Sequence, residues 1–200
     1  MMQATAMILA GGKSTRMGKD KAFLQVGKEK IIDRLVAGLK ETFDQVLIVS
    51  NEPAAYKYLE VDIVSDIIPG LGPLSGMHAG LKSAKHRHSL VMACDMPFIN
   101  IKLGKMLVEE VPGFDVVVPQ VGAYLQPLFA VYDKSCIQPI EECLKNSISK
   151  TTALYPKVRV KYISQEKIAA VADLDMVFLN INTPEELEKA QKADKSEGNA

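Results

Sequence analysis

The sequence lacks an excess of charge of either sign. Lysine and arginine together number 24, and so do aspartate and glutamate, which gives a formal net charge of zero over 200 residues. A chain without a global positive field has no electrostatic means of holding a nucleic-acid backbone. We therefore expect a small-molecule partner and no nucleic acid.

Long hydrophobic runs are also missing. No apolar stretch approaches the roughly 20 residues that a helix needs to cross a bilayer, although 48% of the residues are hydrophobic. The first residues do not show the charged, apolar and small-residue succession of a secretory signal peptide. These absences predict a protein with no membrane partner and a cytoplasmic location.

Cysteine is scarce, with three residues in the whole chain. They form neither a CxxC pair nor a zinc spacing, and they are too few and too scattered for a disulfide framework. Cys136 and Cys143 lie seven residues apart, which is two helical turns on one face. We expect them to be buried thiols of the core rather than a metal or redox site.

A complete Walker A phosphate loop is absent too, although the stretch "ILAGGKSTRMGKDKAF" at residues 8–23 contains its ending, GKST. That loop requires a glycine five residues before the glycine of Gly-Lys-Ser, because consecutive backbone N–H groups wrap around the phosphates. Met7 stands at this position relative to Gly12, and Lys13 stands there relative to Gly18. The stretch therefore holds phosphate-binding residues arranged to a different plan.

What the sequence does contain is an alternation of short apolar runs and helical patterns. Five runs are of the strand type: "TAMILA", "QVLIVS", "VDIVSD", "SLVMACD" and "DVVVPQ". Residues 30–41 and 103–111 instead carry apolar side chains at helical spacing. Apolar runs without strict alternation are typical of strands covered on both faces. The order of these elements predicts an α/β fold with a mostly parallel sheet.

The later part of the chain has weaker patterns. We interpret it as a helix from about Lys134, an extended segment "KVRVKYIS", and a strand running into a helix in "MVFLNINTPEELEKAQ". Thr183 can cap this last helix, Pro184 suits its first turn, and the two glutamates that follow favour the positive end of the helix dipole. Residues 1–192 are expected to form a single domain, and residues 193–200 a polar tail without a packing signal.

Polar residues follow the predicted strands. The glycine-rich loop follows the first strand, Asn51 the second, Asp66 the third and Asp95 the fourth. In open α/β sheets, ligands bind beyond the carboxyl ends of the strands. We therefore expect these residues to converge on one edge of the sheet.

The loop after the first predicted strand has the composition of a polyphosphate site. Small residues that let a ligand lie against the backbone come first: Ala10, Gly11 and Gly12. Four cations follow within nine residues: Lys13, Arg16, Lys19 and Lys21. A guanidinium grips phosphate oxygens with a planar fork, whereas a lysine acts as a point charge. This composition, directly after a strand, favours a phosphate ligand over a merely solvated basic turn.

Two roles are open for Asp95, which follows a buried strand and precedes a strand-ending proline, Pro97. It could cap the next helix. It could also bind Mg²⁺, a hard cation that accepts one or two carboxylates together with phosphate oxygens. The phosphate loop expected at the same edge of the sheet favours Mg²⁺.

Two further motifs are interpreted as structural. The segment "IIPGLGPLSGMHAGL" lacks the spacing of a dinucleotide fingerprint and is expected to be a loop that can approach a ligand closely. The triplet His86-Arg87-His88 is expected to be a solvated turn, because nothing nearby completes a set of metal ligands. No Ser-His-Asp or Cys-His pairing suggests nucleophilic catalysis.

Residues 9–21, "LAGGKSTRMGKDK", resemble the signature of nucleotidyltransferases in the GT-A-like, Rossmann-related superfamily. The AGG and DK details resemble the molybdenum cofactor guanylyltransferase family, as do "GPLSG", "CDMP", "QPLFAVY" and "NINTPEEL" further along the chain. The resemblance spans nearly the whole chain in the same order. It implies a three-layer, Rossmann-like fold with helices on both faces of the sheet.

The activity that the resemblance implies is transfer of GMP from GTP to molybdenum-bound molybdopterin, with release of pyrophosphate. Mg²⁺ would be the cofactor, held by Asp95, and the molybdopterin would arrive free or on a partner protein. The implied nucleotide-binding residues are Leu9, Ala10, Gly11, Gly12, Lys21, Asn51, Asp66 and Asp95. Asn180 and Asn182 would line the pterin side. The implied catalytic residues are Arg16, Lys21 and Asp95, and we assign Arg16 to the β and γ phosphates on grounds of charge.

One departure from the family pattern concerns the pterin side. Where relatives tend to have an arginine, this chain reads "NSISKTTAL" and offers Lys150, which keeps the charge but not the planar fork.

Two alternatives stay open. One is a different nucleotidyltransferase, of the molybdopterin cytidylyltransferase or sugar-phosphate kind, although such relatives usually read AAG where this chain has AGG. The other is a non-catalytic GTP-binding regulator, which would be expected to lose Asp95 or Lys21.

Overall fold

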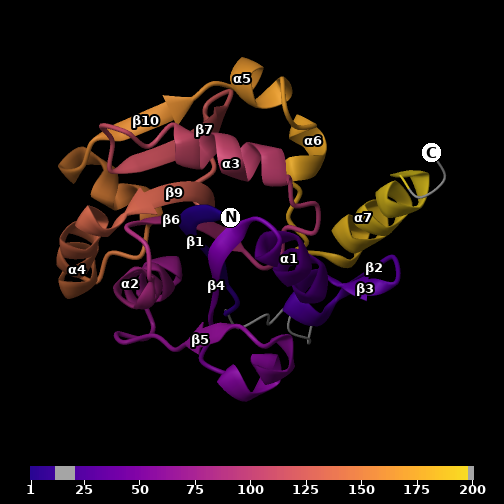
Figure 1. Ribbon diagram of the computed structural model, residues 1–200, viewed down its shortest axis with the longest axis horizontal. Helices are drawn as coiled ribbons and strands as arrows, with labels where there is room; N and C mark the ends of the chain where they lie inside the picture. The colour runs from indigo at the N-terminus through magenta and orange to yellow at the C-terminus, as the bar shows by residue number, and fades with distance from the viewer. Residues whose placement is uncertain (12–20, 198–200) are drawn as a thin grey trace.

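A mostly parallel sheet runs through the centre of the computed structural model, which describes residues 1–11 and 21–197 (Figure 1). The strand order is β10-β7-β9-β6-β1-β4-β5, and β8 pairs with β7. The strands are β1 (Met2–Leu9), β4 (Phe43–Val49), β5 (Asp62–Val64), β6 (His88–Ala93), β7 (Val116–Val121), β8 (Tyr124–Leu125), β9 (Phe129–Asp133) and β10 (Val160–Ile163). β9 is antiparallel to β6 and β7, and β8 to β7, while the remaining ladders of this sheet are parallel. The predicted sheet is therefore confirmed.

Helices cover both faces of the sheet, as expected (Figure 1). One face is covered by α1 (Ile31–Lys40), α3 (Ile101–Glu109), α5 (Gln165–Ala169), α6 (Leu174–Val177) and α7 (Pro184–Glu197). The other is covered by α2 (Pro73–Ser83) and α4 (Ile137–Lys145). Successive strand residues point to opposite faces, so Ile8 packs in the core on the α1 side and Met7 in the core on the α2 side. Among the described residues, no helix combines the length and apolar character needed to cross a membrane.

Helices α1 and α3 form where the apolar spacing predicts them. The buried face of α1 consists of Ile31, Ile32, Leu35, Val36 and Leu39. Asn100 caps α3, since its side-chain oxygen accepts a hydrogen bond from the Leu103 N–H at 2.8 Å. The predicted helix near Lys134 and the extended segment near residue 160 are present as well, as α4 and β10.

Shorter elements connect these layers. Two 3₁₀ helices of three residues are described, η1 (Lys21–Phe23) and η3 (Lys134–Cys136), and two of seven residues, η2 (Pro53–Leu59) and η4 (Thr151–Lys157). A small hairpin of β2 (Gln25–Val26) and β3 (Glu29–Lys30) follows η1. Cys136 and Cys143 are free thiols buried in the core on the α2 side, which confirms the interpretation of both as core residues.

The structure corrects three expectations. The segment "GPLSGMHAGL" is not a loop beyond Gly72, because helix α2 begins at Pro73, a residue well suited to a first helical turn. No strand forms in "MVFLNIN"; its first two residues lie in α6, which Asp173 caps, and residues 178–183 are irregular. Short apolar runs do not distinguish a strand from a buried helical turn. The polar tail expected from residue 193 continues α7 as far as Glu197.

The far end of α7 is packed rather than free. Asp194 forms an ion pair with Arg34 of α1 at 2.7 Å, and the Gln191 side chain donates to the Gln25 carbonyl at 3.2 Å. Gly27, in the turn between β2 and β3, adopts φ +67°, and a Cβ placed there would lie 2.0 Å from the Asp194 carboxylate. The hairpin, α1 and α7 therefore fit closely together.

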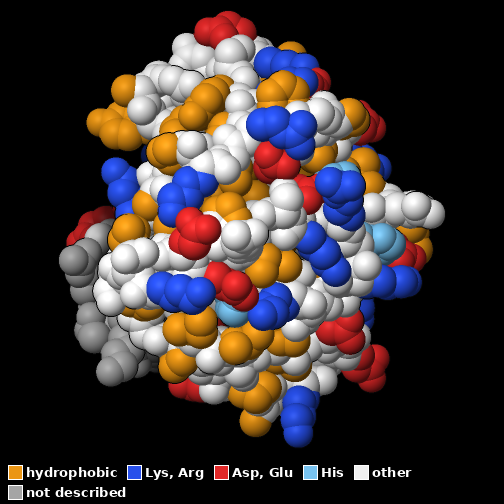
Figure 2. Space-filling model, turned by 90° about the vertical axis from the view of Figure 1, so that its left-hand side faces the viewer, with side chains coloured by type: hydrophobic (Ala, Val, Ile, Leu, Met, Phe, Trp, Pro, Cys, Tyr) orange, Lys and Arg blue, Asp and Glu red, His pale blue; other side chains and the backbone are white. Residues whose placement is uncertain are grey.

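The face formed by α2 and α4 carries charges of both signs, interspersed with hydrophobic side chains (Figure 2). Between the two helices, the buried His78 bonds to Glu141 at 2.9 Å, and Lys82 donates to the same carboxylate oxygen at 3.1 Å. These two bonds lower the pKa of Glu141. The pair of helices is thus joined by a polar contact in addition to its apolar core.

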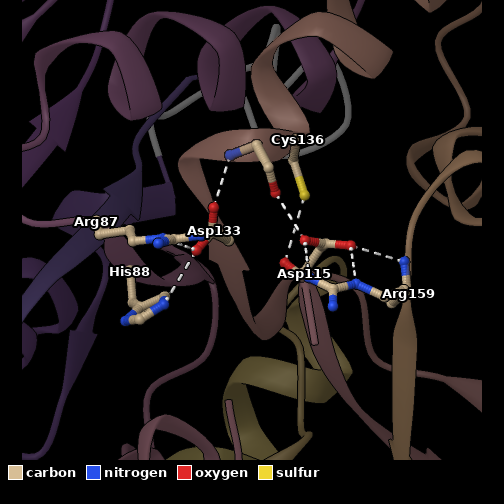
Figure 3. A network of polar contacts seen from close by, with 7 residues as sticks. Arg87, His88, Asp115, Asp133, Cys136 and Arg159 are labelled. Atoms are coloured by element: carbon tan, nitrogen blue, oxygen red, sulfur yellow. Dashed lines mark hydrogen bonds and ion pairs between the residues drawn. The ribbon is translucent and has the colours of Figure 1, made fainter. Parts of the chain in front are cut away.

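The triplet His86-Arg87-His88 lies where a bend leads into β6, and its side chains contact carboxylates. His86 contacts Asp44 at 2.7 Å, whereas Arg87 and His88 both contact the buried Asp133 at the end of β9, at 2.6 and 3.0 Å (Figure 3). Burial opposes the charged form of Asp133, but hydrogen bonds from Ser135 and Arg87 outweigh it and lower its pKa. No group of three or more His, Cys, Asp or Glu side chains in the described part of the chain could hold a metal ion.

A second carboxylate, Asp115, completes this network (Figure 3). It accepts two hydrogen bonds from the Arg159 guanidinium, at 3.0 and 3.1 Å, and one from the Ser135 hydroxyl at 2.9 Å. The Arg159 bonds, against a smaller opposing effect of burial, hold the pKa of Asp115 well below its usual value. Burial raises the pKa of the neighbouring Cys136 thiol to about 12, so this thiol is protonated near neutral pH.

We expect Asp115→Asn to lower the free energy of unfolding at pH 7 by about 1–3 kcal/mol, because it removes charge-assisted hydrogen bonds. A depressed folded-state pKa means that the carboxylate stabilises the fold above its unfolded pKa of about 3.9, and that this contribution is lost as the pH falls toward the folded value. The difference between wild type and variant should therefore narrow below about pH 4.

Urea unfolding from pH 7 to pH 3 measures this difference. Glu41→Gln is the matched control, because it removes an exposed carboxylate at the end of α1. A difference between wild type and Asp115→Asn that stays constant with pH would show that the ion pair does not stabilise the fold through its charge.

Candidate functional site

Three polar side chains meet beyond the carboxyl end of β6. The Lys21 ammonium donates to Asp95 Oδ2 at 3.2 Å and to Asn182 Oδ1 at 2.5 Å. Lys21 begins η1, Asp95 lies two residues after β6, and Asn182 lies two residues before α7. The side chains of Lys21 and Asp95 are only 21% and 19% exposed. Partial shielding from water strengthens their attraction relative to that of fully exposed charges.

Backbone hydrogen bonds fix the segment that carries Asp95. The Cys94 N–H donates to the Leu9 carbonyl at 3.2 Å, and the Ile181 N–H donates to the Asp95 carbonyl at 2.9 Å. Ile181 is fully buried. The end of β1, the end of β6 and the segment before α7 are therefore joined at one edge of the sheet.

A second polar pair lies beyond β4 and β5. The Asn51 amide donates to Asp66 Oδ2 at 2.9 Å, and the Asp66 backbone N–H donates to Asn51 Oδ1 at 3.0 Å. Each residue lies two positions after its strand; Asn51 is exposed, and Asp66 is half-buried. The reciprocal bonds hold the two residues as one unit that is partly open to solvent.

The first turn of α2 approaches this pair. Its N-cap, Gly72, adopts φ +64°, a conformation that favours glycine. A Cβ on Gly76 would lie 3.2 Å from the Leu9 side chain and 3.7 Å from the Asp66 carboxylate. Gly76 thus allows the helix to pack directly on the edge of the sheet. A helix N-terminus at this position presents backbone N–H groups that suit an anion.

The predicted residues of the first loop are only partly described. Leu9 ends β1, and Ala10 is buried, with its N–H donating to the Val49 carbonyl at 2.9 Å. Gly11 is exposed, and a Cβ there would meet open space. Gly12 and Arg16 lie outside the described residues, so the roles expected of them stay predictions.

Two residues of the expected pterin side lie at different places along this edge. Asn180 is half-buried, two residues before Asn182. Lys150, which stands where relatives tend to have arginine, is exposed and precedes η4. The side chain of its neighbour Ser149 comes within 4.0 Å of a Cβ built on Gly72. Lys150 therefore follows a residue that lies near the loop leading into α2.

Sequence reasoning missed a contact of Glu186. One of its carboxylate oxygens, Oε2, accepts hydrogen bonds from the backbone N–H groups of both Asn182, at 2.5 Å, and Thr183, at 3.0 Å. The Glu186 N–H in turn donates to Thr183 Oγ1 at 3.2 Å, which confirms Thr183 as the cap. The spacing Thr-x-x-Glu of a capping box was the signal that could have identified it.

The oxygen atoms at Asp95 are of the type that binds Mg²⁺, but few of them come from the protein. Asp95 supplies one carboxylate, and the Lys21 ammonium that contacts it also contacts the amide oxygen of Asn182. Mg²⁺ is usually bound by one or two carboxylates plus substrate phosphates and retained waters. The residues present therefore suit an ion that arrives with a phosphate-bearing substrate, and not a cage made by the protein alone.

Two hollows in the described surface lie apart from these side chains. One, of about 230 Å³, is lined by Arg34, Pro97, Phe98, Ile99, Asn100, Asp173, Met176 and Val177. The other, of about 530 Å³, is next to Asp115 and Ser135 in the network of Figure 3. Neither is lined by Lys21, Asp95 or Asn182.

Known proteins resemble this chain along most of its length. A probable molybdenum cofactor guanylyltransferase of Pelotomaculum thermopropionicum is 49% identical over 191 residues, covering 96% of this chain and 93% of that protein. A molybdenum cofactor guanylyltransferase of Desulfosudis oleivorans is 40% identical, covering 98% of each. The crystal structure of molybdopterin-guanine dinucleotide biosynthesis protein A from Archaeoglobus fulgidus superposes with a TM-score of 0.85 at 26% identity, covering 96% of this chain and 99% of that one.

Residues 6–158 match the sequence profile of the MobA-like NTP transferase domain. This region contains the end of β1, Asn51, Asp66 and Asp95, while Asn180 and Asn182 lie beyond it. With the extent of the match, the identities above and the cluster at the edge of the sheet, the chain belongs to the MobA-like NTP transferase family and is a nucleotidyltransferase.

Proposed function

We propose that this protein transfers GMP from GTP to molybdenum-bound molybdopterin, forming a guanine dinucleotide cofactor and pyrophosphate. The observation that carries the proposal is the cluster of Lys21, Asp95 and Asn182 at the carboxyl edge of the sheet. The names of the relatives supply the substrates, because they are molybdenum cofactor guanylyltransferases.

The nucleotide would lie along the end of β1. Backbone groups of Leu9, Ala10 and Gly11 would contact it, with Gly12 permitting close approach. The unit of Asn51 and Asp66 would bind the nucleoside, which the exposure of Asn51 and the fixed geometry of the pair both support. Contacts that distinguish the base would come largely from the backbone.

Asp95 would hold Mg²⁺ together with phosphate oxygens of the nucleotide. A bound Mg²⁺ supplies charge neutralisation at phosphates and at a leaving pyrophosphate. Lys21 would contribute a second positive charge at the same place, and its two hydrogen bonds within the cluster would keep that charge fixed. We assign Arg16 to the β and γ phosphates.

The reaction needs little chemistry from the side chains. The terminal phosphate of molybdopterin would attack the α-phosphorus of GTP, forming one P–O bond as the bond to the β-phosphate oxygen breaks. Since that phosphate is already ionised, no general base is required. Catalysis would consist of holding two anions together and neutralising the charge that develops. Asn180 and Asn182 would line the pterin side, with Lys150 in place of an arginine.

Asp95→Asn is expected to lower kcat/KM for pyrophosphate release by about a hundredfold or more, because it removes the carboxylate that would hold Mg²⁺. The assay uses purified protein, Mg²⁺, GTP and molybdopterin. Asp62→Asn is the control, since it removes an exposed carboxylate at the start of β5. An Asp95→Asn variant within a few-fold of the wild type would contradict a catalytic role for this carboxylate.

Among nucleotides, we expect GTP alone to support pyrophosphate release in the presence of molybdopterin. The same assay with CTP, ATP and UTP tests this, because the acceptor and the metal are unchanged. A preference for CTP would assign the protein to the cytidylyltransferases instead. Binding of GTP without release of pyrophosphate from any nucleotide would indicate a non-catalytic regulator.

Asn51→Ala should raise KM for GTP by about fivefold with little change in kcat. The variant removes the two hydrogen bonds that hold Asp66, and a net loss of about 1 kcal/mol in nucleotide binding corresponds to that factor. Steady-state kinetics at saturating molybdopterin measure both constants. Glu52→Ala, at the exposed neighbouring position, should leave both unchanged. A fall in kcat at unchanged KM would contradict a role in nucleotide binding.

A further inference from the structure

The position of Asn182 is set by its neighbours in the chain. Its amide oxygen accepts a hydrogen bond from the Lys21 ammonium at 2.5 Å. Residues 178–183 contain neither helix nor strand, so no regular ladder fixes this segment. On one side it is held by the bond from the Ile181 N–H to the Asp95 carbonyl. The other side is held by Glu186.

The contact of Glu186 reaches further than an ordinary capping box. In a capping box, the glutamate side chain accepts from the N–H of the capping residue. Here the same oxygen, Oε2, also accepts from the N–H of the preceding residue, Asn182. Because both N–H groups point at one carboxylate oxygen, the peptide unit that carries the Asn182 side chain has a defined direction.

The segment that follows Lys21 is also connected to α7. η1 leads from Lys21 into the β2–β3 hairpin, whose Gln25 carbonyl accepts from Gln191 of α7. The ion pair of Arg34 and Asp194 joins α7 to α1. Helix α7 thus contacts Asn182 through Glu186 near its beginning. Its later turns contact the hairpin that follows Lys21 in the chain.

We propose that Glu186 is a positioning residue for nucleotidyl transfer, which holds Asn182 so that it orients the Lys21 ammonium beside Asp95. The inference rests on the proposed function. A lysine ammonium has three N–H donors. With two of them directed at Asp95 and Asn182, the direction of the third is fixed, and this is the donor that a phosphate oxygen would accept from. Loss of Glu186 removes one of these two constraints.

The test compares the two halves of the capping box. Thr183→Ala removes the bond from the Glu186 N–H to the hydroxyl but keeps the carboxylate on the Asn182 and Thr183 N–H groups. Glu186→Ala removes that carboxylate. Both variants weaken the start of α7, so we expect each to lower Tm by about 3 °C. A purely structural role would therefore affect the activity of both equally.

We expect kcat for pyrophosphate release from GTP to fall about tenfold to a hundredfold in Glu186→Ala, with KM for GTP nearly unchanged. Thr183→Ala should keep the wild-type kcat. Glu186→Gln retains one acceptor oxygen and should recover part of the loss. In an Asn182→Ala background, Glu186→Ala should have no further effect on kcat, since the side chain that it orients is already gone.

Equal losses of kcat in Thr183→Ala and Glu186→Ala would overturn the proposal, and so would additive effects of Asn182→Ala and Glu186→Ala. Crystal structures of the two single variants provide a second readout. The distance from Lys21 Nζ to Asn182 Oδ1 should exceed hydrogen-bond length in Glu186→Ala and stay short in Thr183→Ala. If the wild type released no pyrophosphate, the proposed function would fail, whereas this distance would still decide whether Glu186 positions Asn182.

Discussion

The candidate site depends on two hydrogen bonds that the Lys21 ammonium donates. This ammonium joins residues that are 74 and 161 positions away in the sequence, Asp95 and Asn182. A cation placed between a carboxylate and an amide oxygen gives a defined place for further negative charge, which a phosphate substrate brings. Parallel strands make this possible, because β1 and β6 end side by side and their continuations meet at the same edge.

Polar contacts at opposite ends of the sheet serve different purposes. At the amino end of β6, Asp133 and Asp115 are paired with arginine side chains and with Ser135, so their charges are satisfied within the fold (Figure 3). At the carboxyl end, Asp95 and Asp66 are more accessible and are held by one lysine and one asparagine. Charges that are already paired stabilise the fold, whereas accessible charges can exchange partners with a ligand.

Several errors of sequence reasoning have one physical origin. Helix α2 and the irregular segment before α7 are both short, apolar and rich in turn residues, so local pattern does not decide between loop, strand and helix. Their packing decides it. Gly76 lets α2 lie against Leu9 and Val49, and Ile181 is buried as a single anchor rather than as part of a strand. Likewise Asp194 looks like part of a polar tail until Arg34, 160 positions earlier, is placed beside it.

The sequence by itself determined the alternation of strands and helices, the buried cysteines, the cap at Thr183 and the convergence of Asn51, Asp66 and Asp95 on one edge, because periodicity and chain order fix these features locally. Only the tertiary structure decided which side chains touch. Asn182 was expected on the pterin side, and the fold places it against Lys21. Glu186 was expected in the first turn of the last helix, where it lies, and its carboxylate also bonds to two backbone N–H groups. Such contacts depend on distances of a few ångströms between distant segments, which residue patterns do not encode.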